Sequence, residues 1–378
     1  MYSKILIRYG ELTLKGKNRD SFINLLAKNI KRITGEKPIV EFDRMYLTYS
    51  EENLENLKYV FGIISYSPII ECENDIEIIK QKSLLLINNE NKTFKVSARR
   101  NNKSFNNTSN EINNIIGSHV LQNSNLKVDV HNPDLTIFVE VRGKSTYIFD
   151  KVIQALGGLP VGISGRVLHL MSGGIDSPVA AFELMKRGMH VSYLSFVSPP
   201  QTDIKTIEKM KNIVSILNKY QGNSIFYIAN YSKLMNYITF VSNESYKINL
   251  MRRSFYRIAS RKAKELNILA LSNGENLGQV ASQTLESLST IANASDLLIF
   301  RPLLTNDKIE TIEIAKKIGT YEPSIIKANE TCELFAPKQP VTKPTLEKSL
   351  EYEKELAQIP NFEDEILNSL IEEHHFNN

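Results

Sequence analysis

The sequence predicts an α/β protein with three domains, the last of them built on a doubly wound parallel sheet. Three observations lead to this prediction: a length of 378 residues, strands that alternate with helices after Gly165, and a Ser-Gly-Gly turn between the first such strand and helix. A chain of this length normally divides into two or three domains. Strands that alternate with helices form parallel sheets, which bind ligands beyond the carboxyl ends of their strands.

Periodicity and composition divide the chain into four segments. We expect a small α/β unit at 1–58, a second α/β region at 59–164, the parallel-sheet domain at 165–344 and an acidic helical tail at 345–378. The first segment holds a strand at 5–9, a helical pattern at 21–32 and a strand at 44–49. The parallel-sheet domain has predicted strands at 167–170, 190–196, 223–228 and 268–272, and predicted helices at 178–187, 203–219 and 251–266.

Composition is that of an ordinary globular protein, with 42% apolar and 23% charged residues. No apolar run has the length of a membrane span, and the N-terminus lacks the pattern of a signal peptide. The two cysteines, Cys72 and Cys332, make no disulfide framework. These features predict a cytoplasmic protein with no membrane partner.

Charge is unevenly distributed along the chain. The net charge is +4, but the tail from 345 to 378 carries about −7 and the rest about +11. A basic body suggests a polyanionic partner such as nucleic acid. Mild basicity is also common among proteins that bind no nucleic acid, so this observation alone leaves both interpretations open.

The turn Ser172-Gly-Gly-Ile-Asp-Ser177 has the layout of an anion-binding loop. Its two glycines can take backbone angles closed to other residues, and amides at a helix start face a bound phosphate. No Gly-Lys-Ser/Thr follows, which excludes the phosphate loop of kinases and GTPases. The pattern favours a loop that holds the pyrophosphate of ATP during attack on the α-phosphate. The alternative is a glycine-rich turn without a ligand.

Other polar residues follow the ends of neighbouring strands and are expected near this loop. Ser195 and Phe196 close the second strand, where an adenine or ribose would lie. The segment 273–283 offers glycines for close approach and the amides of Gln279 and Gln283. Two candidate phosphate ligands are Lys308, at a helix start, and one of the pair Arg252 and Arg253, with the other arginine solvated.

Two loops of the N-terminal half are rich in cations, and the second of them also carries an aromatic residue. Lys15, Lys17 and Arg19 lie in a Gly-punctuated loop, and Arg99, Arg100 and Lys103 precede Phe105. Cations beside an aromatic ring suit RNA phosphates and unpaired bases, so these six residues are candidate RNA contacts. A solvated loop is the competing explanation.

Cys332 lies in a polar, Pro-rich segment and is a candidate nucleophile or persulfide carrier, unless it is an incidental thiol. Cys72 adjoins an apolar strand, so we expect a structural thiol whose pKa is raised by neighbouring carboxylates. His169 lies within an apolar strand pattern and is expected in the core rather than in catalysis.

The motifs, taken in order, resemble the tRNA 4-thiouridine synthetase family of adenylating sulfurtransferases, and the resemblance covers essentially the whole chain. The segments that carry it are Arg8–Arg19, Ala98–Phe105, Ser172–Ala181, Asn273–Thr284, Arg301-Pro-Leu, Asp307-Lys308 and Thr331–Pro340. The resemblance implies a ferredoxin-like α+β domain, a THUMP RNA-binding domain and a doubly wound ATP-pyrophosphatase domain. The rhodanese domain of longer members is not expected, because no cysteine follows Cys332.

The resemblance also implies roles for individual residues. ATP contacts fall on Leu170, Met171, Ser195, Phe196, Arg252, Gly274 and Gln283. Ser172, Gly173, Gly174, Asp176 and Ser177 would surround the pyrophosphate. Asp176 would hold Mg²⁺, Lys308 would neutralise phosphate charge, and Cys332 would handle sulfur.

The implied reaction adenylates uridine 8 of tRNA at O4 and replaces that oxygen by sulfur, releasing AMP and pyrophosphate. The implied partners are tRNA, a cysteine desulfurase as persulfide donor, the thiamine-pathway sulfur carrier protein and a second copy of the chain. Two other classes stay open at this point. One is a different ATP-pyrophosphatase, such as a lysidine-type tRNA ligase or an amidotransferase; the other is a non-catalytic RNA-binding protein.

Overall fold

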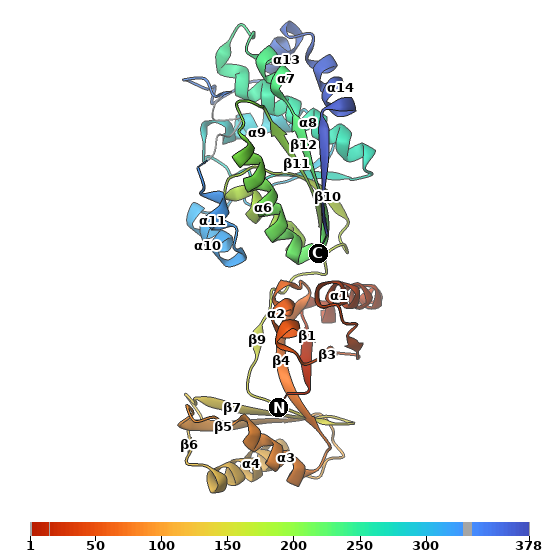
Figure 1. Cartoon of the computed structure of the whole chain (residues 1–378), viewed down its shortest axis with the longest axis vertical. Helices are drawn as coiled ribbons and strands as arrows, with labels where there is room; N and C mark the ends of the chain where they lie inside the picture. The colour runs from red at the N-terminus through yellow and green to blue at the C-terminus, as the bar shows by residue number, and fades with distance from the viewer. Residues whose placement is uncertain (1, 15, 328–334, 378) are drawn as a thin grey trace. The chain divides into compact units, whose positions relative to one another are not determined.

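The computed structural model describes residues 2–14, 16–327 and 335–377, and the chain forms two compact units (Figure 1). The first unit is Met1–Leu159 and the second is Pro160–Asn378. Each unit has its own sheet and its own hydrophobic core. Among the described residues, no helix has both the length and the hydrophobicity needed to cross a bilayer.

The sheet of the first unit runs in the order β2-β3-β1-β4-β8-β7-β5-β6, with β9 also paired to β4. Its strands are β1 (Lys4–Tyr9), β2 (Ile39–Val40), β3 (Arg44–Thr48), β4 (Ile63–Cys72), β5 (Thr93–Arg100), β6 (Lys127–Val128), β7 (Leu135–Val141), β8 (Thr146–Phe149) and β9 (Ile153–Gln154). The long strand β4 pairs with β1 through Ile69 and with β8 from Ile70 onward. One strand therefore serves both halves of this unit, just after the boundary that we expected at residue 58.

Helices cover the sheet of the first unit: α1 (Arg19–Thr34), α2 (Glu51–Asn56), α3 (Ile76–Ser83) and α4 (Ser109–Asn123), with 3-10 turns η1 (Glu11–Leu14), η2 (Leu57–Tyr59) and η3 (Leu84–Leu86). Local sequence sets their ends. Helix α4 begins with a reciprocal capping box between Thr108 and Glu111, and α1 ends at Gly35, which is left-handed with φ of 77°.

The second unit contains the predicted parallel sheet, in the order β14-β13-β10-β11-β12-β15. Its strands are β10 (Arg166–Leu170), β11 (His190–Val197), β12 (Asn223–Asn230), β13 (Ala270–Ser272), β14 (Leu298–Phe300) and β15 (Ile371–Asn377). All neighbours are parallel except β12 and β15, which are antiparallel. The four strands predicted in this domain are confirmed.

Helices form two groups around this sheet: α5 (Asp176–Lys186), α6 (Ile204–Gln221), α7 (Ser232–Ile238), α8 (Lys247–Glu265), α9 (Leu285–Ala292), α10 (Lys308–Ile318), α11 (Tyr321–Ser324), α13 (Leu346–Glu355) and α14 (Ile359–Ser369), with turns η4 (Glu244–Tyr246) and η5 (Ala281–Gln283). Helix α5 contacts α6 and α10, whereas α8 contacts α7, α9, α13 and α14. This is the doubly wound arrangement that the alternating pattern predicts.

The acidic tail is only partly helical. Helices α13 and α14 fit the prediction, but Ile371–Asn377 forms the edge strand β15. The tail also corrects our expectation that one of the two arginines on α8 is solvated. Arg253 is 2% exposed and its Nε lies 2.9 Å from Glu353 Oε1. That partner lies a hundred residues away in sequence, so no local pattern could reveal it.

Candidate active site

The Ser172–Ser177 loop connects β10 to α5 at the carboxyl end of the parallel sheet. Ser177 is buried and braces the loop. Its Oγ accepts a hydrogen bond from Ser172 N at 3.0 Å and donates one to Ser172 O at 3.1 Å. The loop backbone is therefore fixed around the start of α5, where helix amides favour an anion.

The loop glycines do not have the backbone conformation that we expected. Neither Gly173 nor Gly174 has a positive φ. The close approach instead occurs at Gly274, after β13, where an added Cβ would lie 2.6 Å from Ser177 N and 2.7 Å from Asp176 C. A glycine is required at this position because the two backbones touch.

Asp176 and Lys308, both predicted site residues, meet in the structure. Lys308 Nζ lies 2.6 Å from Asp176 Oδ1, and Gln279 Nε2 donates to Asp176 Oδ2 at 3.0 Å. Asp307 and Glu310 form a capping box that fixes the start of α10 and hence the backbone of Lys308. The Asp176 and Lys308 side chains are 22% and 41% exposed, so solvent reaches this pair.

Arg252 lies in a buried ion cluster on the opposite side of the site. It pairs with Glu275 Oε1 and donates from Nη1 to Ser282 O at 2.7 Å. Glu275 Oε2 also accepts from Arg301 Nε at 2.6 Å and from the hydroxyl of Tyr256 at 3.1 Å. The Arg252 guanidinium is thus held within a buried cluster, whereas the contact between Lys308 and Asp176 is partly exposed.

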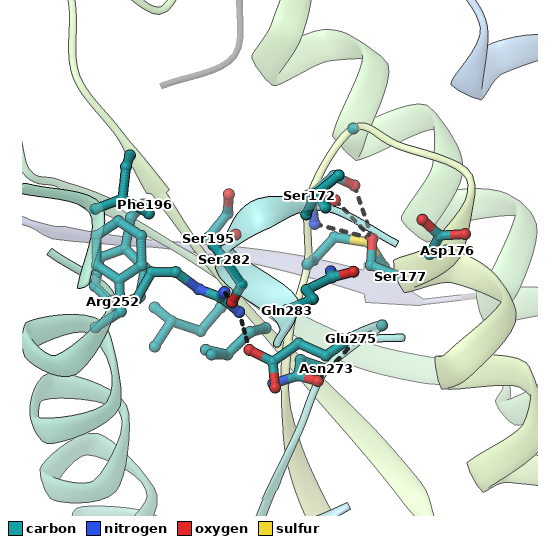
Figure 2. A pocket seen from close by; sticks show the side chains of 18 of the residues that line it. Ser172, Asp176, Ser177, Ser195, Phe196, Arg252, Asn273, Glu275, Ser282 and Gln283 are labelled. Carbon is teal, nitrogen blue, oxygen red and sulfur yellow. Dashed lines mark hydrogen bonds and ion pairs between the residues drawn. The ribbon is translucent and has the colours of Figure 1, made fainter. Parts of the chain in front are cut away.

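A cavity of about 510 Å³ joins these groups. Figure 2 shows the Ser172–Ser177 loop at one side of it, Phe196 and Arg252 at the other, and Glu275 and Gln283 between them. Its lining includes eleven predicted residues: Leu170, Met171, Ser172, Gly173, Asp176, Ser177, Ser195, Phe196, Arg252, Gly274 and Gln283. The predicted residues Gly174 and Lys308 do not line the cavity.

One wall of the cavity is aromatic. The rings of Phe196 and Phe255 stack with centroids 4.0 Å apart and planes at 3°. At the centre, Gln283 Oε1 is buried without a hydrogen-bond partner among the described residues. A flat apolar wall beside an unfilled acceptor suits a ligand that carries a ring and a donor group.

The donor set suits Mg²⁺ together with ATP. Mg²⁺ is usually held by one or two carboxylates and by phosphate oxygens. Asp176 provides such a carboxylate at the start of α5, with both of its oxygens engaged by the polar groups of Lys308 and Gln279. For Asp176 to bind a metal that arrives with phosphates, Lys308 or Gln279 would have to give up its carboxylate oxygen.

The candidate RNA residues lie in the first unit. Lys17, Arg99 and Lys103 are exposed. Arg19, at the start of α1, stacks on the exposed ring of Phe42, with 4.2 Å from its guanidinium carbon to the ring centroid. Arg100 Nη1 donates to Phe105 O at 3.0 Å, which orders the basic loop. Lys15 lies outside the described residues.

The remaining expectations concern the cysteines and His169. Cys332 lies outside the described residues. Burial raises the pKa of Cys72 to about 11, more strongly than the carboxylates to which we attributed the shift. His169 is fully buried, as predicted, with Nδ1 2.8 Å from Ser272 Oγ, and burial lowers its pKa to about 3.

Sequence reasoning did not identify several residues of this site. Glu275 and Arg301 lie in motifs that carry the family resemblance, but the motifs predicted no role for them, and Tyr256 and Phe255 lie outside every motif. Tyr256 and Phe255 lie on one face of α8, one turn after Arg252, so helical periodicity could have indicated them.

The fold and site define a nucleotide-binding enzyme domain, with an anion loop at the end of a parallel strand, joined to a second α/β unit. Family models match accordingly: the ThiI ferredoxin-like domain at residues 4–67, the THUMP domain at 77–150 and thiamine biosynthesis protein (ThiI) at 162–358. The three-domain fold class predicted from the sequence is confirmed. The chain belongs to the ThiI family of tRNA sulfurtransferases.

Curated relatives match along nearly the full length. The chain is 69% identical to the probable tRNA sulfurtransferase of Mycoplasmopsis agalactiae, covering 98% of this chain and 99% of the relative. It is 41% identical to the protein of the same name in Brevibacillus brevis, covering 98% and 96%.

A solved structure also matches the chain along its length. The crystal structure of a 4-thiouridine synthetase–RNA complex with bound ATP has a TM-score of 0.94 and 36% identity, and the match covers 100% of both chains. A Pyrococcus horikoshii protein with a TM-score of 0.66 and 23% identity shows the fold alone.

Proposed function

We propose that this chain adenylates uridine 8 of tRNA at O4 and then replaces that oxygen by sulfur, giving 4-thiouridine, AMP and pyrophosphate. The observation that carries the proposal is the cavity, in which the Ser172–Ser177 loop faces Arg252 and an aromatic wall. Support comes from the 36% identical 4-thiouridine synthetase, whose crystal structure contains RNA and ATP.

The phosphates of ATP would lie between the loop and Lys308. Loop amides and the start of α5 provide donors that are already in place, so little reorganisation accompanies the reaction. Asp176 would hold Mg²⁺, which would supply positive charge to offset the charge that develops on the phosphates. Lys308, displaced from Asp176, would meet the leaving pyrophosphate as a point charge.

The adenylation step transfers the AMP group from ATP to the base. The target uridine leaves its stack so that O4 reaches the α-phosphate. The new O4–phosphorus bond forms as the bond to pyrophosphate breaks, and the N3 proton is released. The resulting adenylated base has a C4 carbon with a good leaving group.

Sulfur then displaces AMP at C4. We propose that Cys332 carries this sulfur as a persulfide or attacks the persulfide of a partner. The terminal sulfur forms the bond to C4 as AMP leaves. A thiol of the donor protein or of a low-molecular-weight reductant then attacks the Cys332 sulfur, which releases 4-thiouridine and leaves a mixed disulfide at Cys332. Ala336 and Pro340 line the cavity, so the segment that follows Cys332 in sequence reaches the proposed site.

The partners follow from the same proposal. A cysteine desulfurase would supply the persulfide, the thiamine-pathway sulfur carrier protein would be a second acceptor, and two copies of the chain would cooperate in the cytoplasm. The candidate RNA contacts are Lys15, Lys17, Arg19, Arg99, Arg100 and Lys103. We retain the division at 1–58, 59–164, 165–344 and 345–378 as a proposal, with β4 shared between the first two domains.

Product analysis tests this function directly. Purified protein with ATP, Mg²⁺ and unmodified tRNA should form AMP and pyrophosphate, and added persulfide-loaded desulfurase should give 4-thiouridine at position 8. Cys332→Ser should abolish thiolation while tRNA binding is retained. Absence of AMP would refute adenylation, and undiminished thiolation by Cys332→Ser would refute the role of that cysteine.

A further inference from the structure

Glu275 is a buried carboxylate in a cavity that we expect to hold a polyanion. It is 3% exposed and follows Gly274 directly at the end of β13. Both of its oxygens are used, one by Arg252 and the other by Arg301 and Tyr256. Its placement needs an explanation, because a carboxylate near phosphates repels them.

The contacts around Glu275 form a closed network. Glu275 N donates to Asn273 Oδ1 at 3.0 Å, and Asn273 Nδ2 donates to the hydroxyl of Tyr256. That hydroxyl donates back to Glu275 Oε2. Asn273 therefore holds the Glu275 backbone, and three side chains hold its carboxylate, which fixes the direction of that carboxylate.

The two arginines around Glu275 outweigh its negative charge. Arg252, Arg301 and Glu275 together carry one net positive charge. Arg301 faces Glu275 and does not line the cavity, whereas Arg252 does. Arg301 thus neutralises the carboxylate, and Glu275 fixes the cation that the nucleotide would meet.

We propose that Glu275 is a positioning residue that holds the Arg252 guanidinium in the orientation that binds ATP. This inference rests on the proposed function, since it takes the cavity to be the ATP site. A fixed guanidinium loses little side-chain entropy when phosphates bind, whereas a free one must be ordered at that moment.

Two substitutions separate this role from simple electrostatics. Glu275→Gln makes the site more positive, so through-space charge alone predicts tighter binding of a polyphosphate. Glu275→Asp keeps the charge but shortens the side chain by one methylene, so it cannot reach both arginines. If Glu275 positions Arg252, both variants weaken binding by about tenfold or more, since small misplacements have large effects.

The probe is α,β-methylene-ATP with Mg²⁺, titrated into the full chain by calorimetry. Glu286→Gln, an exposed carboxylate on the first turn of α9, is the matched control for charge and should bind as the wild type does. In an Arg252→Met background, Glu275→Asp should have no further effect on affinity, because the cation through which Glu275 acts is gone.

The outcomes are distinct. Tighter binding by Glu275→Gln, wild-type affinity of Glu275→Asp, or an equal loss in the Arg252→Met background would each overturn the positioning role. A wild-type chain that does not bind the analogue would overturn the proposed function, and this inference with it. Glu275→Asp keeps the test decisive should Glu275→Gln fail to fold.

Discussion

Substitution of Gly274 by alanine should disturb folding and nucleotide binding together. An added Cβ would lie 2.6 Å from Ser177 N, 2.7 Å from Asp176 C and 2.9 Å from Ser177 Cα. All three atoms are backbone at the start of α5, so no flexible side chain can move aside. The segment after β13 and the first turn of α5 must separate.

The size of the effect follows from this geometry. Relaxing the shortest contact from 2.6 Å to 3.4 Å needs a displacement of about 0.8 Å. Overpacking of this kind typically costs about 1–3 kcal/mol of folding free energy. Because the contacts are with backbone, which moves less easily than a side chain, we expect Gly274→Ala to lower the free energy of unfolding by about 2 kcal/mol or more. For a unit of this size that corresponds to a Tm lower by roughly 4–8 °C. The displaced loop should also lower nucleotide affinity, by up to about 100-fold.

Thermal unfolding and calorimetric titration with α,β-methylene-ATP measure the two effects on one preparation. Gly117→Ala is the control, because Gly117 lies inside α4 with no heavy atom within 4 Å of an added Cβ. It should leave affinity unchanged and raise stability slightly, by about 0.5–1 kcal/mol. A Gly274→Ala protein with wild-type Tm and affinity would refute the close-approach argument.

Three further substitutions test other parts of the second unit. Lys308→Met should lower affinity for Mg²⁺-ATP about tenfold with little change in Tm, since its pair with Asp176 is partly exposed; unchanged affinity would count against its phosphate role. Arg253→Met should lower the free energy of unfolding in urea by about 1–3 kcal/mol, because Glu353 keeps its pair with Arg257 but loses Arg253, and Thr290 O loses a buried donor, and Arg253→Met/Glu353→Met should recover part of the loss. Because burial lowers the pKa of His169 to about 3, below an unfolded value near 6.5, its contribution to stability is present above pH 6.5 and lost as the pH falls toward 3. The stability difference between wild type and His169→Gln should therefore shrink by about 2 kcal/mol from pH 7 to pH 5, and a constant difference would contradict this.

Elements with strong local periodicity could be predicted from the sequence. The strands at 167–170 and 190–196 and the helix at 203–219 match β10, β11 and α6 within two residues at each end. Strand β15 could not be predicted this way. Its sequence, Ile371-Glu-Glu-His-His-Phe-Asn, is polar, and it is a strand because β12 leaves an edge that it can pair with.

The candidate site was predictable in its residue types but not in its pairings. Strand-end logic placed Arg252 and Ser172 at one cavity, because the carboxyl ends of parallel strands meet at one edge. The partners of the charged residues are set by tertiary contacts. The sequence places Glu275 in a motif but predicts no partner for it. The structure shows that its carboxylate pairs with two arginines, Arg252 and Arg301.

The charge distribution along the sequence predicted only part of what the structure shows. The contrast between a basic body and an acidic tail suggested a polyanionic partner, yet part of it is satisfied within the chain. Arg257 pairs with Glu353 and Glu363, and Arg261 Nη2 lies 2.6 Å from Asp364 Oδ1. The acidic tail therefore neutralises one face of α8, and net charge overstates the cations left for RNA on this unit.

The two cations of the site differ in how firmly they are held, and this difference orders their roles. Arg252 is held by Glu275 and by Ser282 O in a buried cluster, so we expect its geometry to change little when a ligand binds. Lys308 Nζ contacts Asp176, at a partly exposed position where exchange of partners costs little. A cation held in one place can recognise the bound nucleotide. A cation that can change its partner can stay with a negatively charged group as that group leaves. We therefore expect Lys308 to follow the departing pyrophosphate, and Arg252 to define where ATP binds.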